Sequence, residues 1–166
     1  MKKQLLFIAL MVITISQMYA QAGTTIGAHL SYGTKDLNLG FGARGEFGVA
    51  DKISISPKFT YHTGRSEGGA SVTGWNLDGD VHYYFTNEGI SFYGIAGLTY
   101  ASSTVKVGQF GGGSQSFSDS KIGINLGAGA NFSSGGNLIP FAEIKYNSPF
   151  EAILISAGVK FGVGGK

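Results

Sequence analysis

Apolar and polar side chains alternate at every second position along most of the chain after its first 22 residues. In the segment ISISPKFTYH, residues 53–62, Ile53, Ile55 and Phe59 alternate with Ser54 and Lys58. Successive side chains of a β-strand point to opposite faces, whereas a helix repeats every 3.6 residues. The pattern therefore predicts an all-β protein whose strands have one apolar face and one small or charged face.

Eight segments are predicted to be strands. Seven carry this alternation, and residues 90–100 are apolar on both sides, so the facing of that strand stays ambiguous. The segments are residues 25–33, 39–49, 53–64, 75–85, 90–100, 121–132, 138–147 and 152–161. Each has about 9 to 12 residues, the length of a strand that crosses a bilayer at a tilt of about 45°. The longest connection, residues 101–120, is predicted to be a loop, and no run of 18 apolar residues indicates a membrane-spanning helix. The fold predicted is an eight-stranded antiparallel transmembrane up-and-down β-barrel.

The first 22 residues have the pattern of a secretory signal peptide. Lys2 and Lys3 precede an apolar run, residues 5–15, that is too short to span a bilayer, and Ala20 and Ala22 permit cleavage after either residue. We therefore expect a cleaved signal at 1–22 and a single barrel domain at 23–166. Without Lys2 and Lys3, the twelve basic residues fall to ten and equal the ten acidic ones, so no nucleic-acid partner is indicated.

Alternation alone does not decide which face points inward, since a soluble lipocalin-like barrel has the same period. Charged residues make up only 13% of the chain, about half the usual share of a soluble domain, which favours lipid outside and charges inside. The predicted lumenal charge network comprises Arg44, Glu46, Lys58, His62, Asp78, Asp80, His82, Glu143, Lys145 and Lys160. The predicted aromatic girdles, which would lie at the two membrane interfaces, comprise Tyr32, Phe41, Tyr61, Trp75, Phe85, Phe92, Tyr100, Phe132, Tyr146 and Phe161.

With its signal peptide, eight alternating strands, mid-strand charges in GARGEF and FAEIKY, and the final strand ending AGVKF, the chain resembles the small OmpA/OmpX-type, porin-like outer-membrane β-barrel proteins of Gram-negative bacteria. The resemblance implies an outer-membrane location with both termini periplasmic, and contact with lipid and lipopolysaccharide. It also implies recognition of Phe161 by the barrel-assembly machinery, although five residues follow Phe161 in this chain. Members of this group are variously adhesins, defence factors, structural proteins and narrow channels.

Three motifs raise sharper hypotheses. Asp78, Asp80 and His82 suggest a metal site, but Asp78 and His82 would lie about 13 Å apart on a regular strand, so pairing with lumenal cations is favoured and no metal is predicted. His29 and Ser31 resemble the His and Ser of lipid A deacylases, without an orienting carboxylate nearby in the sequence. Residues 111–114, GGGS, lack the Lys and Ser/Thr of a phosphate loop and are predicted to be a flexible loop.

The function predicted is that of a structural or surface-interaction protein of adhesion or defence type, without cofactor or catalysis, because an eight-stranded barrel is filled by its own side chains. The partner would bind through residues 101–120. The alternatives are a narrow passive pore, a soluble lipocalin-like binder of apolar ligands and, on the weakest signal, a lipid A-modifying enzyme.

Overall fold

A computed structural model describes residues 23–35, 37–64, 66–67, 70–86, 89–108, 114–132 and 136–163, so the predicted signal peptide lies outside it. The strands are β1 (Thr24–Gly33), β2 (Leu39–Ala50), β3 (Ile53–His62), β4 (Ser66–Glu67), β5 (Ala70–Tyr84), β6 (Ile90–Gly108), β7 (Ser114–Phe132), β8 (Leu138–Asn147) and β9 (Ala152–Val163). Within these described ranges, no helix is long and apolar enough to cross a membrane.

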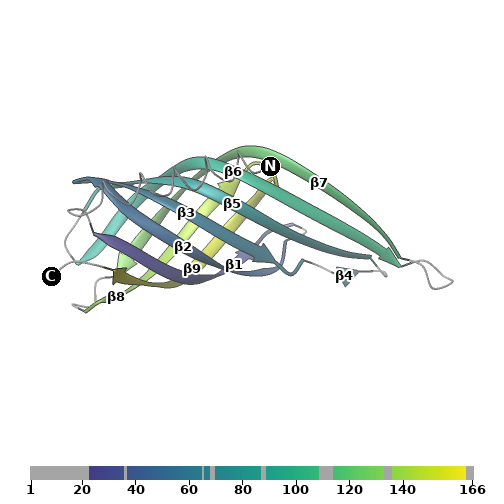
Figure 1. Ribbon diagram of the computed structural model, residues 1–166, viewed down its shortest axis with the longest axis horizontal. Coiled ribbons are helices and arrows are strands. Elements are labelled where there is room, and N and C mark those ends of the chain that lie inside the picture. Colours follow the sequence, from purple (N-terminus) through teal and green to yellow (C-terminus); the bar gives the residue numbers. More distant parts are fainter. Residues whose placement is uncertain are drawn as a thin grey trace, which may run out of the picture.

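The strands form one antiparallel sheet that closes on itself (Figure 1). Each long strand pairs with its neighbours in sequence, β1 pairs with β9, and β3 pairs with β5 to complete the ring. The two-residue strand β4 is attached only to the start of β5, where Ser66 pairs with Ser71. The eight long strands therefore make the predicted up-and-down barrel, and the fold class is confirmed.

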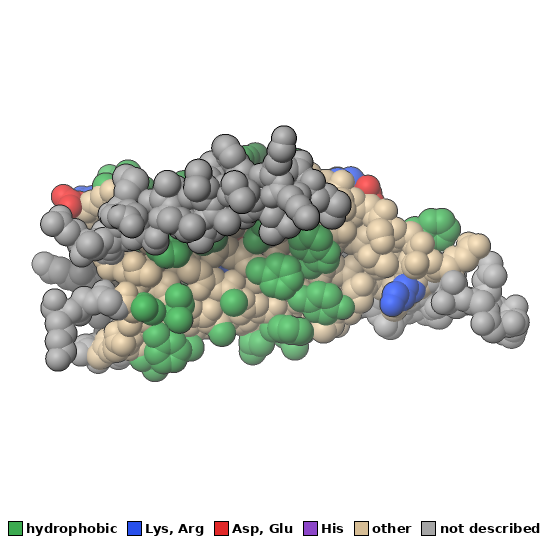
Figure 2. All heavy atoms as spheres, viewed as in Figure 1, with side chains coloured by type: hydrophobic (Ala, Val, Ile, Leu, Met, Phe, Trp, Pro, Cys, Tyr) green, Lys and Arg blue, Asp and Glu red, His purple; other side chains and the backbone are tan. Residues whose placement is uncertain are grey.

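The barrel is polar inside and apolar outside. In β3, Ser54, Lys58 and His62 are buried, whereas Ile55 and Phe59 are exposed. Across the described residues, 22 polar or charged side chains are buried but only seven hydrophobic ones. Figure 2 shows hydrophobic side chains on the visible barrel wall and charged ones mainly toward the two ends. The lipocalin-like alternative is therefore wrong, because it requires the apolar face to line the interior.

The two ends of the barrel differ. At one end, the tight turn at residues 51–52 joins β2 to β3, and Thr24 of β1 pairs with Val163 of β9. At the other end, β5, β6 and β7 extend far beyond the remaining long strands (Figure 1). The first and last described residues of the barrel therefore lie at the same end as this tight turn, and the extension lies at the opposite end.

The prediction of a loop is wrong for residues 101–108 and 114–120, and residues 109–113 lie outside the described ranges. β6 and β7 stay paired without interruption from Ile90 and Phe132 to Gly108 and Ser114, and β5 begins at Ala70 and follows β6 outward. Of the GGGS motif, Ser114 starts β7, whereas residues 111–113 lie outside the described ranges. We call residues 101–108 and 114–121 the hairpin extension.

Hydroxyl side chains on the outer face of the hairpin extension explain why a polar segment remains β-structured. The hydroxyls of Thr104 and Ser118 lie 2.9 Å apart, and Ser120 donates a hydrogen bond to Ser102 at 3.0 Å. Cross-strand hydroxyl pairs of this kind stabilise antiparallel sheets. The extension is therefore a continuation of the barrel wall.

Candidate functional site

Glu143 on β8 lies at the centre of the ion pairs in the lumen. Its carboxylate accepts hydrogen bonds from Arg44 at 2.5 Å, from Lys58 at 2.7 Å and from the Tyr93 hydroxyl at 2.9 Å. Arg44 also lies over the ring of Phe141, with 4.4 Å from its guanidinium carbon to the ring centroid. Because Glu143 serves two buried cations, it joins β2, β3, β6 and β8 across the interior.

A second carboxylate, Glu46 on β2, organises the lumen toward the tight-turn end. Lys160 donates to it at 2.6 Å, Tyr84 donates a short hydrogen bond, and Arg44 lies 3.5 Å away. His82 lies between the two carboxylates: its Nδ1 is 3.5 Å from Glu46 and its Nε2 is 4.0 Å from Glu143. The imidazole stacks on the Tyr93 ring, with 4.6 Å between centroids.

Asp78 and Asp80 bind Lys145 together, toward the end that carries the hairpin extension. The Lys145 ammonium donates to Asp78 at 2.6 Å and to Asp80 at 2.9 Å. Asp80 also accepts a hydrogen bond from Asn125 at 2.9 Å. The structure thus directs Asp78 and Asp80 to Lys145 and His82 to the neighbourhood of Glu46, so these three residues do not converge on one point.

The remaining histidines of the polar face are buried and contact neutral side chains at hydrogen-bond distance. His62 contacts the side-chain oxygen of Asn76 at 3.2 Å, away from the ion pairs, and His29 contacts the Thr60 hydroxyl at 3.0 Å. The Ser31 hydroxyl accepts a hydrogen bond from Ser156 at 3.2 Å. These hydrogen bonds of His29 and Ser31 lead to different strands, and they do not join the two residues as a base and a nucleophile.

A small apolar cluster lies over the lumen at the end that carries the extension. Leu37, from the β1–β2 connection, is buried with Ala152 and Leu154 of β9, and Phe150 packs against them from the turn before β9. The rings of Phe150 and His62 form a T-shaped pair, with 5.9 Å between ring centroids. We call Leu37, Phe150, Ala152 and Leu154 the apolar cover. Buried ion pairs lie in the lumen below this cover.

The aromatic residues predicted to form girdles lie on the outer wall. Most are exposed, and Tyr61 and Trp75 are half-buried against neighbours. Phe41 and Tyr61 have ring centroids 5.7 Å apart, and those of Trp75 and Tyr100 are 5.5 Å apart, so a row of aromatic rings crosses strands β2 to β6. Their position at a membrane interface stays a prediction.

The outer edge of β7 is open along the hairpin extension. On its other side β7 pairs with β6 along its whole length, but β8 pairs only with residues from Asn125 onward. Ser148 ends this second ladder, since its hydroxyl accepts from the Ile124 amide at 2.9 Å and its own amide donates to the Ile124 carbonyl at 3.1 Å. Within the described residues, no strand pairs with this edge from Ser114 to Gly123.

The backbone groups at this edge follow from the position of Ile124. Both its N–H and its C=O point toward Ser148, away from β6. Alternate residues of an antiparallel strand direct these groups to the same side. Ser116, Ser118, Ser120 and Ile122 therefore present N–H and C=O groups at the open edge, in the form that an added strand would bind.

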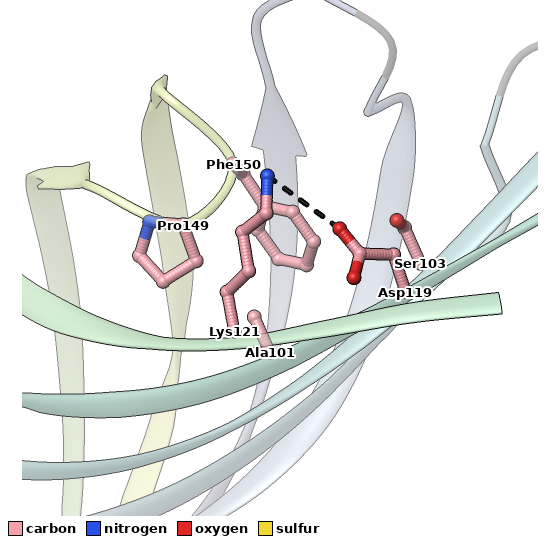
Figure 3. A pocket seen from close by; sticks show the side chains of 6 residues that line it. All are labelled: Ala101, Ser103, Asp119, Lys121, Pro149 and Phe150. Atoms are coloured by element: carbon pink, nitrogen blue, oxygen red, sulfur yellow. Dashed lines mark ion pairs between the residues drawn. The ribbon is translucent and has the colours of Figure 1, made fainter.

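A pocket lies on the inner face of this edge (Figure 3). Lys121 and Asp119 of β7 and the side chains of β6 face Pro149 and Phe150 of the turn before β9 across it. It is lined by Ala101, Ser103, Asp119, Lys121, Pro149 and Phe150. The Lys121 ammonium and the Asp119 carboxylate are 3.5 Å apart and both largely exposed, so they are accessible to a partner.

Comparison with known proteins assigns the family. The model for "Outer membrane protein beta-barrel domain" matches residues 5–164. The chain belongs to this family. It is therefore an outer-membrane β-barrel protein of the kind found in Gram-negative bacteria, as the alternation and the resemblance predicted. A search of curated protein sequences found no match.

Solved structures share the fold at low sequence identity. Ail, the attachment invasion locus protein of Yersinia pestis, is 20% identical with a TM-score of 0.57, covering 87% of this chain and 98% of Ail. The N-terminal barrel of Pseudomonas aeruginosa OprF is 17% identical with a TM-score of 0.64, covering 86% and 100%. Neisserial surface protein A is 16% identical with a TM-score of 0.61, covering 86% and 97%. At these identities the likeness establishes the architecture alone.

Sequence reasoning missed the neutral partners of the lumen, the apolar cover and the open edge. Tyr93 and Asn125 share the parity of inward positions on their strands, and that parity is the signal that could have identified them. Leu37 and Phe150 are single apolar residues in polar connections and carry no periodic signal. The open edge depends on the unequal lengths of β7 and β8, which the loop prediction for residues 101–120 concealed.

Proposed function

We propose that this protein is a surface-interaction protein of the outer membrane that binds an extended partner segment by strand addition to the open edge of β7. The observation that carries the proposal is the row of unpaired backbone groups from Ser116 to Ile122. An extended peptide gains main-chain hydrogen bonds from such an edge and specificity from alternate side chains. The role is non-catalytic and needs no cofactor.

The filled lumen supports interaction over transport. Buried ion pairs at Glu46, Glu143 and Lys145 occupy the interior, and the apolar cover lies above them. A barrel of eight strands has an interior just wide enough for its own side chains. A passive pore would need these groups to move aside together, so the hairpin extension is the better candidate for function.

The fold relatives are consistent with a surface role. The name of Ail describes attachment and invasion, and one structure of Ail is a complex with the heparin analogue sucrose octasulfate. The name of neisserial surface protein A describes a surface protein. By analogy, we propose an adhesion or defence role for this chain, with the exact partner set by its edge residues.

The proposed orientation has the hairpin extension outside the cell and both ends of the barrel chain in the periplasm. Outer-membrane barrels have short periplasmic turns and longer extracellular segments. The outer wall would contact lipid and lipopolysaccharide, with the aromatic girdles at the interfaces and the lumenal charges shielded inside. Phe161, an exposed aromatic near the end of β9, is the proposed contact for the barrel-assembly machinery.

Orientation is tested by cysteine labelling, since the chain has no Cys. In intact cells, Ser116→Cys should react with a membrane-impermeant maleimide, whereas Lys52→Cys, in the tight turn at the other end, should react only after the outer membrane is permeabilised. Labelling of Lys52→Cys but not of Ser116→Cys in intact cells would reverse the proposed orientation.

Strand addition is tested by proline at an outward-facing amide. Ser118→Pro removes one edge donor without removing a β6–β7 hydrogen bond, and edge strands tolerate proline. We expect cells expressing Ser118→Pro to lose adherence to cultured host cells, while the matched variant Ser118→Ala adheres like wild type. The gel mobility of unboiled protein verifies folding of both. Equal adherence of the two folded variants, or no adherence of wild type, would refute the proposal.

A further inference from the structure

We propose that the open edge of β7 selects an antiparallel peptide strand with the order acidic, any, basic, any, apolar. This inference rests on the proposed function and specifies the chemistry of its partner. The three β7 residues that read the peptide are Lys121, Asp119 and Phe117, which occupy alternate positions on the inner face of the hairpin extension. Phe117 is 62% exposed, and its direct cross-strand partner on β6 is Val105.

The order follows from strand direction. Every long-strand pairing in the sheet is antiparallel, and antiparallel pairing is slightly more stable per residue than parallel pairing. An antiparallel peptide meets Lys121 first, then Asp119, then Phe117. A carboxylate opposite Lys121, an ammonium or guanidinium opposite Asp119 and an apolar side chain opposite Phe117 therefore complete the face.

The hydrogen-bond pattern places these three residues at positions where side chains of paired strands lie closest together. Because the amides of Ser116, Ser118, Ser120 and Ile122 point to the edge, the residues between them form the non-hydrogen-bonded pairs with an added strand. Side chains in such pairs are the closer ones, with Cβ atoms about 4.5–5.5 Å apart. Lys121, Asp119 and Phe117 are thus the residues that define specificity, and the serines supply main-chain affinity.

The pocket in Figure 3 favours glutamate at the acidic position. A side chain opposite Lys121 lies beside Pro149 and Phe150, which line the pocket together with Lys121 itself. The two methylenes of glutamate can pack on these apolar groups while the carboxylate meets the ammonium. The paired part of the peptide must begin near this position, because Ser148 already occupies the edge at Ile124.

Membrane geometry excludes a second copy of the chain in the same membrane as the occupant. Two barrels side by side in one bilayer are related by an axis along the membrane normal, so their β7 strands, each tilted by about 45°, would cross at about 90°. Crossed strands cannot form an antiparallel ladder. The edge therefore fits a segment free to orient itself, such as an exposed strand or an extended tail of another protein.

The test uses two labelled peptides and the wild-type barrel in lipid nanodiscs. One peptide is Thr-Glu-Thr-Lys-Thr-Val-Thr, and the matched control exchanges its Glu and Lys. Fluorescence anisotropy should show about tenfold tighter binding of the first, since two favourable cross-strand charge pairs become two like-charge pairs in the control. In the double variant Asp119→Lys/Lys121→Asp the preference should reverse, and Ser118→Pro should weaken binding of both peptides.

Equal affinity of the two peptides for wild type, or an unchanged preference in the double variant, would overturn the inference. Absence of binding by either peptide at millimolar concentration would overturn it as well. If Ser118→Pro still abolishes cell adherence in those cases, strand addition stands and only the predicted peptide chemistry is wrong. If adherence is unaffected, both fail.

Discussion

Replacing Glu143 by glutamine should destabilise the barrel more than neutralising either Asp78 or Glu151. The substitution keeps the shape of the side chain but removes its charge. The remaining carboxylate partner of Lys58 is then Asp80 at 3.9 Å, and that of Arg44 is Glu46 at 3.5 Å. Removing one partner of a buried ion pair typically costs about 3–5 kcal/mol, because the remaining charge stays buried. We expect a loss of that size in the free energy of unfolding of Glu143→Gln.

Two further variants calibrate this expectation. Asp78→Asn leaves Lys145 with Asp80 at 2.9 Å, so only a hydrogen bond to a charged group is weakened and the loss should be about 1.5–3 kcal/mol. Glu151→Gln breaks the exposed pair with Lys35, 3.1 Å apart, and should cost less than about 1 kcal/mol. The order Glu143, Asp78, Glu151 follows from burial and from the number of partners that each carboxylate serves.

The measurement is urea unfolding in lipid vesicles, followed by the fluorescence of Trp75, the single tryptophan of the chain, and by gel mobility. Adding Lys58→Met to Glu143→Gln removes one of the stranded cations and should recover at least about 1 kcal/mol, as coupled residues do in a double-mutant cycle. A Glu143→Gln variant within about 1 kcal/mol of wild type would refute the reasoning. Water in the lumen would then hydrate the charges well enough that the pairs contribute little.

Two other predictions concern packing inside the barrel. Gly129→Ala would place a Cβ 2.5 Å from Cζ of Tyr93 and should lower the free energy of unfolding in urea by about 1–3 kcal/mol. The control Gly79→Ala adds its Cβ in open space and should leave the free energy of unfolding unchanged. Equal stability of the two variants would show that the Tyr93 ring moves freely. Phe150→Ala should leave the conductance of planar bilayers at background, because the ion pairs of Lys58 and Lys145 still fill the lumen below the apolar cover. Stable conductance steps would show that the apolar cover alone closes the lumen.

Where the two faces of a strand meet different environments, the sequence was sufficient to predict the strand. The predicted bounds 138–147 match β8, and the predicted start at residue 152 matches that of β9. In these strands Ile144 and Ile155 face outward while Lys145 and Ser156 are buried. Apolar residues face lipid and polar residues face the lumen, so the alternation in the sequence follows the two environments directly. The inside-out burial and the membrane location follow from the same contrast.

The contrast disappears along the hairpin extension, and the prediction failed there. Residues 101–120 show only short alternation, with Val105, Val107 and Phe117 on one face and serines on the other, interrupted by a glycine-rich stretch, so the period-two signal is weak. The segment is nevertheless a strand pair because β6 and β7 are already aligned where Tyr100 meets Ile122, and each further pair extends an existing ladder. Growth from an aligned pair avoids the entropic cost of closing a new loop.

The choice of partners inside the lumen also lies beyond sequence pattern. Alternation identifies which charges face inward, but Glu143 meets Arg44 and Lys58 across 99 and 85 residues of chain. Those meetings depend on the stagger between strands around the closed barrel, which alternation does not encode. The inward parity of these charges could be predicted, whereas the central position of Glu143 and the place of His62 outside the ion pairs could not.

Stagger and unequal strand length together explain why binding should reside outside the barrel. β8 ends at Asn147, opposite Asn125, and Ser148 satisfies the backbone of Ile124, while β7 continues to Ser114. Inside the barrel the described carboxylates and ammonium groups already meet partners of opposite charge, so little polar capacity is left there for a ligand. The backbone N–H and C=O groups at the β7 edge from Ser116 to Ile122 are available to a ligand, because β7 extends past the end of β8, the strand that would have paired with them.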